Sequence, residues 1–71
     1  MNVYSLRGST IRVGRTAEYG PTYVLARYDR SHKTYCARNV HNGIEEIVHT
    51  RTLLTWWREG LIHVLSAREA S

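Results

Sequence analysis

Apolar and polar residues alternate near the start of the chain and predict a β-hairpin over residues 3–13. A two-residue turn at Gly8 and Ser9 is favoured, because a Gly-first dipeptide is a common hairpin turn. This turn places Leu6 opposite Ile11 and gathers the apolar side chains of both strands on one face. The opening segment is therefore expected to be an amphipathic two-stranded ribbon.

Two further apolar stretches, 22–29 and 33–40, predict the central strands of a sheet. A connection through residues 29–32 would place Leu25 opposite Cys36. One face then holds Val24, Ala26, Tyr35 and Ala37, and the other holds Tyr23, Leu25, Arg27, Thr34, Cys36 and Arg38. Because both faces are partly apolar, these strands are expected to be covered on part of each side.

Turn-forming residues separate the predicted strands. Gly14, Gly20 and Pro21 are unfavourable inside a strand, so the segment they bound is expected to be a surface loop. Asn42 and Gly43 form the commonest type I′ hairpin dipeptide and predict a tight turn into a strand that ends near residue 49.

A short helix is predicted from a Thr50 cap to a left-handed C′ residue at Gly60. At about 100° per residue, Leu53, Leu54 and Trp57 fall within one arc that faces the sheet. Trp57 lies in the middle of this arc and is expected to be core.

Trp56 lies about 100° from Trp57, at the edge of the buried stripe. It is therefore either a lid on a shallow core or a contact residue for a partner. Arg58 lies next to it on the exposed face, and tryptophan and arginine are enriched at binding hot spots.

These elements predict one small α+β domain over residues 1–66, followed by a flexible tail over residues 67–71. Its architecture is a curled antiparallel sheet of about five strands, or a partial barrel, with the short helix packed on it. The last strand covers residues 61–65. With 71 residues, the chain buries only about 60% of its unfolded surface, so few large side chains can be spared from the core.

The charge is uneven along the chain. Residues 1–38 carry seven cationic and two acidic side chains, a net +5, whereas residues 39–71 carry three and four, a net −1. Nine of the ten cations are arginines, which favour planar bidentate or stacked contacts. The first half is therefore expected to attract a polyanion or an acidic protein surface, although basic charge also simply keeps a small protein soluble.

Tyrosines are interleaved with these cations between residues 23 and 38. This pattern is typical both of single-strand nucleic-acid binders and of protein interfaces against acidic partners. The expected binding residues are Arg7, Arg12, Tyr23, Arg27, Arg30, Lys33, Arg38, Trp56 and Arg58.

The sequence favours binding over catalysis. The spacing of the four histidines and Cys36 matches no zinc-site pattern, and neither a cofactor motif nor a nucleophile motif occurs, so no metal or cofactor is expected. A small ribonuclease with His32 as general acid or base is the remaining enzymatic alternative. The single cysteine and the lack of a long apolar run predict a cytoplasmic protein without a membrane span.

In overall format, a short, basic, single-domain chain without a catalytic motif, the protein resembles small proteins that bacteriophages and mobile elements make to seize host machinery. Inhibitors of RNA polymerase and of CRISPR complexes are among them. The resemblance implies a protein that acts by occupying a surface of a host component without doing chemistry, with transcription favoured. From its basic charge, the expected target is an acidic surface of a host protein, and the chain itself is expected to be a monomer. Direct binding of DNA or RNA by the same Arg/Tyr face is the alternative.

Overall fold

The computed structural model describes residues 6–66 and shows an α+β fold of five strands and one helix. The predicted fold class is confirmed. Along the chain the elements are β1 (Thr10–Val13), β2 (Thr22–Asp29), β3 (Thr34–Asn39), β4 (Glu45–His49), α1 (Thr50–Arg58) and β5 (Ile62–Ser66).

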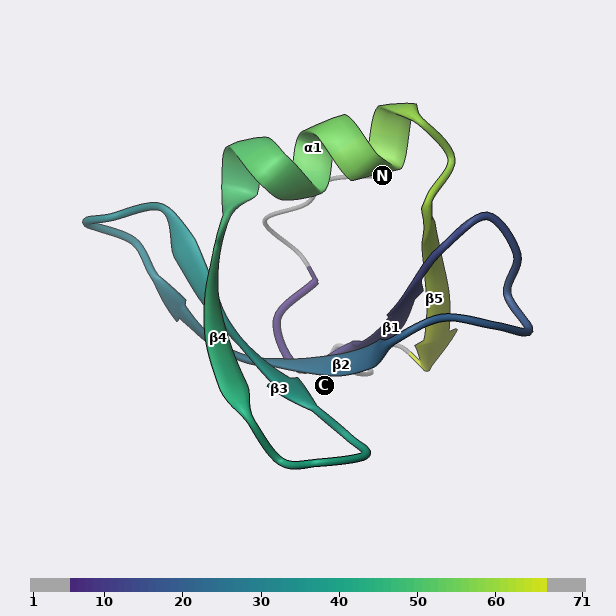
Figure 1. Cartoon of the computed structure of the whole chain (residues 1–71). Coiled ribbons are helices and arrows are strands. Elements are labelled where there is room, and N and C mark those ends of the chain that lie inside the picture. The colour runs from purple at the N-terminus through teal and green to yellow at the C-terminus, as the bar shows by residue number, and fades with distance from the viewer. Residues whose placement is uncertain (1–5, 67–71) are drawn as a thin grey trace.

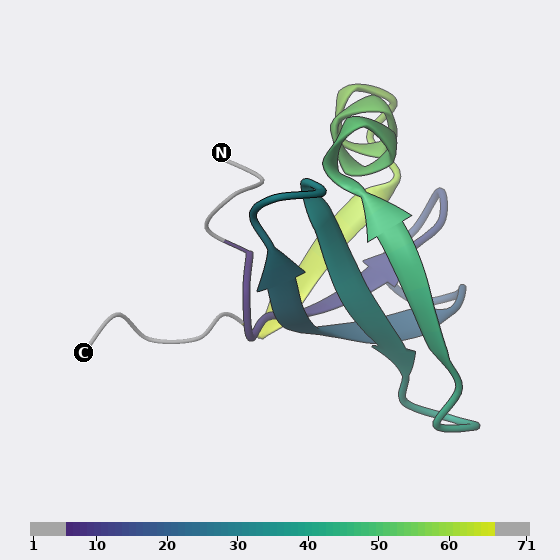
Figure 2. The ribbon, with the colours of Figure 1, turned by 90° about the vertical axis from the view of Figure 1, so that its left-hand side faces the viewer.

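The strands form a single antiparallel sheet in the order β4-β3-β2-β1-β5. The sheet curls without closing, and α1 runs across its open side (Figure 1). Because α1 follows β4 and precedes β5, it connects the two edge strands directly. Figure 2 shows the helix capping the curled sheet at one end.

The core fills the concave side of the sheet, between the strands and α1. Leu53 is the fully buried apolar side chain of the helix, and Tyr35 is the largest fully buried side chain of the sheet. The buried cluster consists of Leu6, Ile11, Leu25, Tyr35, Ala37, Leu53 and Ile62. Buried residues thus come from β1, β2, β3, β5 and the short segment before β1. β4 adds the half-buried Val48.

Both ends of α1 are capped. His49 is the N-cap, one residue earlier than predicted, and its Nδ1 accepts a hydrogen bond of 3.0 Å from the Arg51 amide. At the other end Gly60 has φ of +73°, and the Leu61 amide donates to the Trp56 carbonyl at 2.8 Å. This is the predicted left-handed C′ glycine, within a Schellman motif.

The predicted pairing of the first hairpin is wrong. Instead of turning at Gly8 and Ser9, the chain turns around Arg7 and Gly8, where the Ser9 amide donates to the Leu6 carbonyl at 2.9 Å. β1 then pairs with β2 and β5, so Leu6 reaches the core from a separate turn. The rest of the predicted partner strand, residues 3–5, lies outside the described residues.

The predicted register of β2 on β3 is also wrong, and this changes the faces of the strands. Leu25 lies opposite Ala37, but Arg27 lies opposite Cys36, because Ala26 forms a bulge between the two pairs. A one-residue slip moves side chains to the other face of a strand. Consequently Tyr35 and Ala37 share the core face with Tyr23 and Leu25. Arg27, Cys36 and Arg38 lie on the opposite, outer face of the sheet, where Cys36 is covered by its neighbours.

The turn between β3 and β4 is longer than the predicted two-residue hairpin. The Asn39 amide donates to the Ile44 carbonyl at 2.9 Å, so four residues lie between this pair. Asn39 Oδ1 also accepts a bond of 2.8 Å from the His41 amide within the turn. The resulting register brings Arg38 opposite Glu45.

The predicted division between the two tryptophans is wrong as well. Trp56 and Trp57 are both half-buried, and both pack against the core. The buried stripe is centred on Leu53, and by helical rotation the two indoles lie about 60° and about 40° to either side of it. The pair therefore flanks one deeply buried leucine.

Truncation of that leucine is expected to be costly. Leu53→Ala should lower the free energy of unfolding by about 2–5 kcal/mol, because the helix would lose its fully buried apolar side chain and leave a cavity. Thr55→Ala, on the exposed face of the same helix, should change it by no more than about 0.5 kcal/mol. Urea denaturation of both variants measures the difference, and equal losses would contradict this account of the core.

Candidate functional site

Three cations meet around one aromatic ring at the β2–β3 turn. Arg7, Arg30 and Lys33 line an open hollow of about 510 Å³ together with Tyr28. We call this the cationic hollow. Three of the nine predicted binding residues are thus brought together, although they come from two segments far apart in the sequence.

Backbone contacts position these cations. The Gly8 amide donates to the Leu25 carbonyl at 2.7 Å and so fixes the turn that carries Arg7 against β2. Lys33 has φ of +54°, and its carbonyl accepts a bond of 2.9 Å from the Thr50 amide at the start of α1. The backbone on both sides of the hollow is therefore tied to the rest of the fold.

The aromatic floor of the hollow is also anchored. The ring of Tyr28 lies 4.8 Å from that of Tyr35, between centroids, at an angle of 46°. Burial raises the pKa of Tyr35, while backbone hydrogen bonds at Leu6 and Arg7 act in the opposite direction. The Tyr35 hydroxyl thus stays neutral and connects the segment that carries Arg7 to the sheet.

The carboxylate of Asp29, the acidic residue of the turn, is hydrogen-bonded by neighbouring residues. Asp29 Oδ1 accepts from the Ser31 hydroxyl at 2.7 Å and from the Ser31 amide at 3.0 Å, and Asp29 Oδ2 lies 2.7 Å from His32 Nδ1. These bonds, first that from Ser31 and then that from His32, lower the pKa of Asp29 from 3.8 to about 2.

This Asp-Ser-His group closes the turn and does not form a catalytic triad. Ser31 and Asp29 both approach the same ring nitrogen, Nδ1, of His32. In a triad the nucleophile and the carboxylate would bond to opposite nitrogens of the imidazole. In addition, His32 does not line the cationic hollow.

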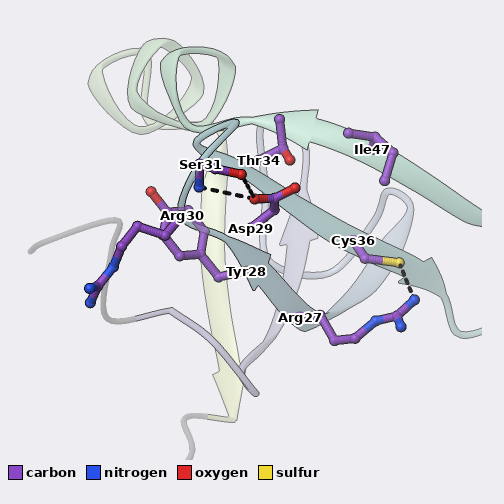
Figure 3. Close-up of a pocket in the computed structure, with 8 residues that line it drawn as sticks. All are labelled: Arg27, Tyr28, Asp29, Arg30, Ser31, Thr34, Cys36 and Ile47. Carbon is purple, nitrogen blue, oxygen red and sulfur yellow. Dashed lines mark hydrogen bonds between the residues drawn. The ribbon is translucent and has the colours of Figure 1, made fainter.

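A second open hollow, of about 650 Å³, lies on the outer face of β2, β3 and β4 (Figure 3). It shares Tyr28 and Arg30 with the cationic hollow, and the Arg30 side chain extends away from the Asp29–Ser31 pair. Its far side is formed by Ile47, a residue that is 70% exposed. An apolar contact surface therefore adjoins the cations.

Arg27 is partly neutralised by its surroundings on this outer face. Its Nη2 lies 3.9 Å from Cys36 Sγ and 3.6 Å from Glu45 Oε2, and the Cys36 thiol donates to the same carboxylate at 2.8 Å. The pKa of Arg27 is raised, first through the hydrogen bond to the Cys36 sulfur. With Arg38 directly opposite Glu45, two predicted binding arginines flank one carboxylate.

The remaining predicted residues lie elsewhere. Arg12 is held by the Thr22 hydroxyl at 3.1 Å and by the Ala17 carbonyl. Arg58 is exposed in the last turn of α1, where a cation suits the helix dipole. The nine predicted residues therefore do not form one continuous face.

Tyr23 and Trp56 do not belong to an exposed Arg/Tyr face. Tyr23 lies opposite Ile11 and packs against the core, since the bulge at Ala26 reverses the predicted faces. Trp56 and Tyr23 both line a small cavity of about 20 Å³ between α1 and the sheet. These two residues support the domain from the inside.

Sequence reasoning missed the contributions of Tyr28 and Ile47 to the two hollows. Tyr28 lies within the basic, aromatic segment, but no local pattern indicates which tyrosine of that segment lines a hollow. Ile47 would have been identified only from the correct β3–β4 register, which directs it outward opposite Cys36.

Comparisons with models of known protein families, with curated proteins and with solved structures give no match. Within residues 6–66, no group of three or more His, Cys, Asp or Glu side chains is arranged to hold a metal ion. The one described helix is too short to cross a membrane.

The depressed pKa of Asp29 predicts a pH dependence of stability. A carboxyl group with a folded-state pKa below its unfolded value stabilises the fold above about pH 4, and this contribution is lost as the pH falls towards 2. Asp29→Asn should therefore be less stable than the natural protein at pH 6 but approach it near pH 2. Denaturation at both pH values measures this, and NMR titration of an Asp29 pKa near 4 would contradict it.

Proposed function

We propose that this chain is a non-enzymatic binding protein whose cationic hollow docks onto an acidic surface of a protein in the nucleic-acid machinery of a host cell. Its effect would be to regulate or inhibit that machinery. RNA polymerase is the favoured target. That choice rests on the resemblance in size and charge to phage-made host-takeover proteins.

The observation that carries the proposal is the convergence of Arg7, Arg30 and Lys33 on one hollow, which no carboxylate of residues 6–66 lines. The nearest acidic residue along the chain, Asp29, is bonded to Ser31 and His32 within the turn. Among the described residues, three cations therefore exceed the single carboxylate nearby, and this net positive charge would attract negative groups on a partner.

The limited extent of the hollow favours an acidic protein surface over a nucleic acid. A groove for single strands follows the phosphate backbone with a track of cations. Here Arg27 is paired with Glu45, and Arg12 is held by neighbouring groups, so these two do not extend the hollow into a track. The exposed Ile47 nearby supplies the apolar contact area that protein interfaces combine with charge.

Charge reversal tests this assignment. The double variant Arg30→Glu/Lys33→Glu should bind purified bacterial RNA polymerase at least about tenfold more weakly than the natural protein, because complementary charge becomes like charge. Affinity is measured by immobilising each protein and titrating the polymerase. A gel shift with nonspecific DNA and RNA at low salt, run in parallel, should show no complex.

The matched control is Arg15→Glu/Arg51→Glu. It changes the net charge by the same amount at two exposed positions outside the hollow, and a glutamate at position 51 suits the first turn of α1. This control should retain polymerase binding. A nucleic-acid shift that only the Arg30/Lys33 variant abolishes, without polymerase binding, would identify nucleic acid as the ligand and overturn the proposal.

A further inference from the structure

β4 is an edge strand with a row of backbone groups directed away from the sheet. The Asn39 amide donates to the Ile44 carbonyl, and the Thr50 amide donates to the Lys33 carbonyl, both at 2.9 Å. Since residues alternate in direction along an antiparallel strand, the even-numbered residues of β4 bond to β3. The amides of Glu45, Ile47 and His49 and the carbonyls of Glu45 and Ile47 therefore point to the open edge, whereas the carbonyl of His49, the N-cap, accepts the first bond of α1. Figure 2 shows no described segment beside this edge.

The side chains of the same three residues lie on the outer face of the sheet. Ile47 is 70% exposed, although it lies in the middle of a regular strand. His49 accepts the Arg51 amide at Nδ1, so its neutral form carries the proton on Nε2 and presents a donor. Glu45 presents a half-exposed carboxylate, whose Oε2 already accepts from the Cys36 thiol and lies near Arg27, so Oε1 is the oxygen that would accept a further bond. Along this edge an acceptor, an apolar side chain and a donor thus follow one another at two-residue spacing.

We propose that β4 pairs with β4 of a second copy of this chain, antiparallel and with a two-fold axis at Ile47. In this register Ile47 lies opposite Ile47, and Glu45 of each copy lies opposite His49 of the other. Residues directly opposite each other on one face are close enough for their side chains to interact. The edge is therefore complementary to itself in hydrogen bonding and in its apolar centre.

The backbone adds to this complementarity. The Ile47 pair would exchange two amide-to-carbonyl bonds, because its amide and carbonyl both point to the open edge. The His49 amide of each copy would donate to the Glu45 carbonyl of the other and add two more. Pairing would extend the sheet across both copies and cover the edge that isolated β4 exposes.

The other edge of the sheet is less suited to such pairing. β5 has an irregularity in its register with β1 near Thr10, which interrupts a flat ladder. Its most exposed large apolar side chain, Leu65, is 43% exposed, compared with 70% for Ile47. β4 is therefore the edge on which a second copy would dock.

The contact is small. One strand pair buries less than the roughly 1,200 Å² typical of stable complexes, so the dimer should be weak and dependent on concentration. This inference differs from the monomer expected from the sequence. It does not rest on the proposed function, because the cations of the hollow take no part in the pairing. Ile47 is shared by the two proposed contacts, so pairing would cover it and leave it available to another protein only in the monomer.

Sedimentation equilibrium from about 10 µM to about 1 mM tests the dimer, since this range covers weak dissociation constants. The mass of the natural protein should rise towards twice the monomer mass across this range. Ile47→Pro should raise the dissociation constant at least about tenfold. It removes an amide that points away from β3, so the β3–β4 ladder keeps its bonds.

Ile47→Lys provides a second test that keeps the backbone amide. It sets two like charges against each other at the two-fold axis, and it should also raise the dissociation constant at least about tenfold. Tyr19→Ser is the control, because Tyr19 is 76% exposed in the loop before β2 and should not affect pairing. Circular dichroism checks that each variant is folded.

Two outcomes would overturn the proposal. One is a natural protein that remains a monomer at about 1 mM. The other is self-association that folded Ile47→Lys leaves unchanged, since the contact would then lie on another surface. Unchanged polymerase binding by the charge-reversal variant would contradict the proposed function but leave the self-association result untouched, so the two proposals can fail separately.

Discussion

The bulge at Ala26 is the constraint on which both the core and the surface of this domain depend. Before the bulge, Tyr23 and Leu25 face the core; after it, Tyr28 does. Without the extra residue, Arg27 would point inward, and burying an unpaired guanidinium is far more costly than burying a tyrosine ring. The bulge therefore directs the Tyr28 ring to the core face, where it contacts Tyr35 at a tilted angle, and leaves Arg27 on the outer face beside Glu45.

The types of the elements could be predicted from the sequence, but their registers could not. Alternation, glycine positions and the helical arc predicted β2, β3, β4 and α1 and the C-terminal cap of the helix, because those signals are local. The register of β2 on β3 depends on the number of residues in the turn and on the bulge, and neither has a local sequence signal here. Likewise, the turn at Gly8 is not part of a hairpin, since its segment forms backbone hydrogen bonds with Leu25 of β2.

The candidate site was predicted in part for the same reason. Positive charge in the first half of the chain is a property of composition, and three of its cations do meet, at Arg7, Arg30 and Lys33. Which cations meet is a property of tertiary structure. In the sequence Arg12 and Arg27 cannot be distinguished from these three. In the structure Arg12 is hydrogen-bonded within the chain, and Arg27 is paired with Glu45.

The helix has a geometric consequence for the sheet. Because α1 begins directly after β4 and is followed by the capped turn that leads to β5, its length of nine residues, about 14 Å, acts as a rigid spacer between the two edges. The curvature of the sheet is thus matched to the length of one helix. A related chain with one more helical turn would need a flatter sheet or a longer connection, so helix length would determine how far this architecture opens.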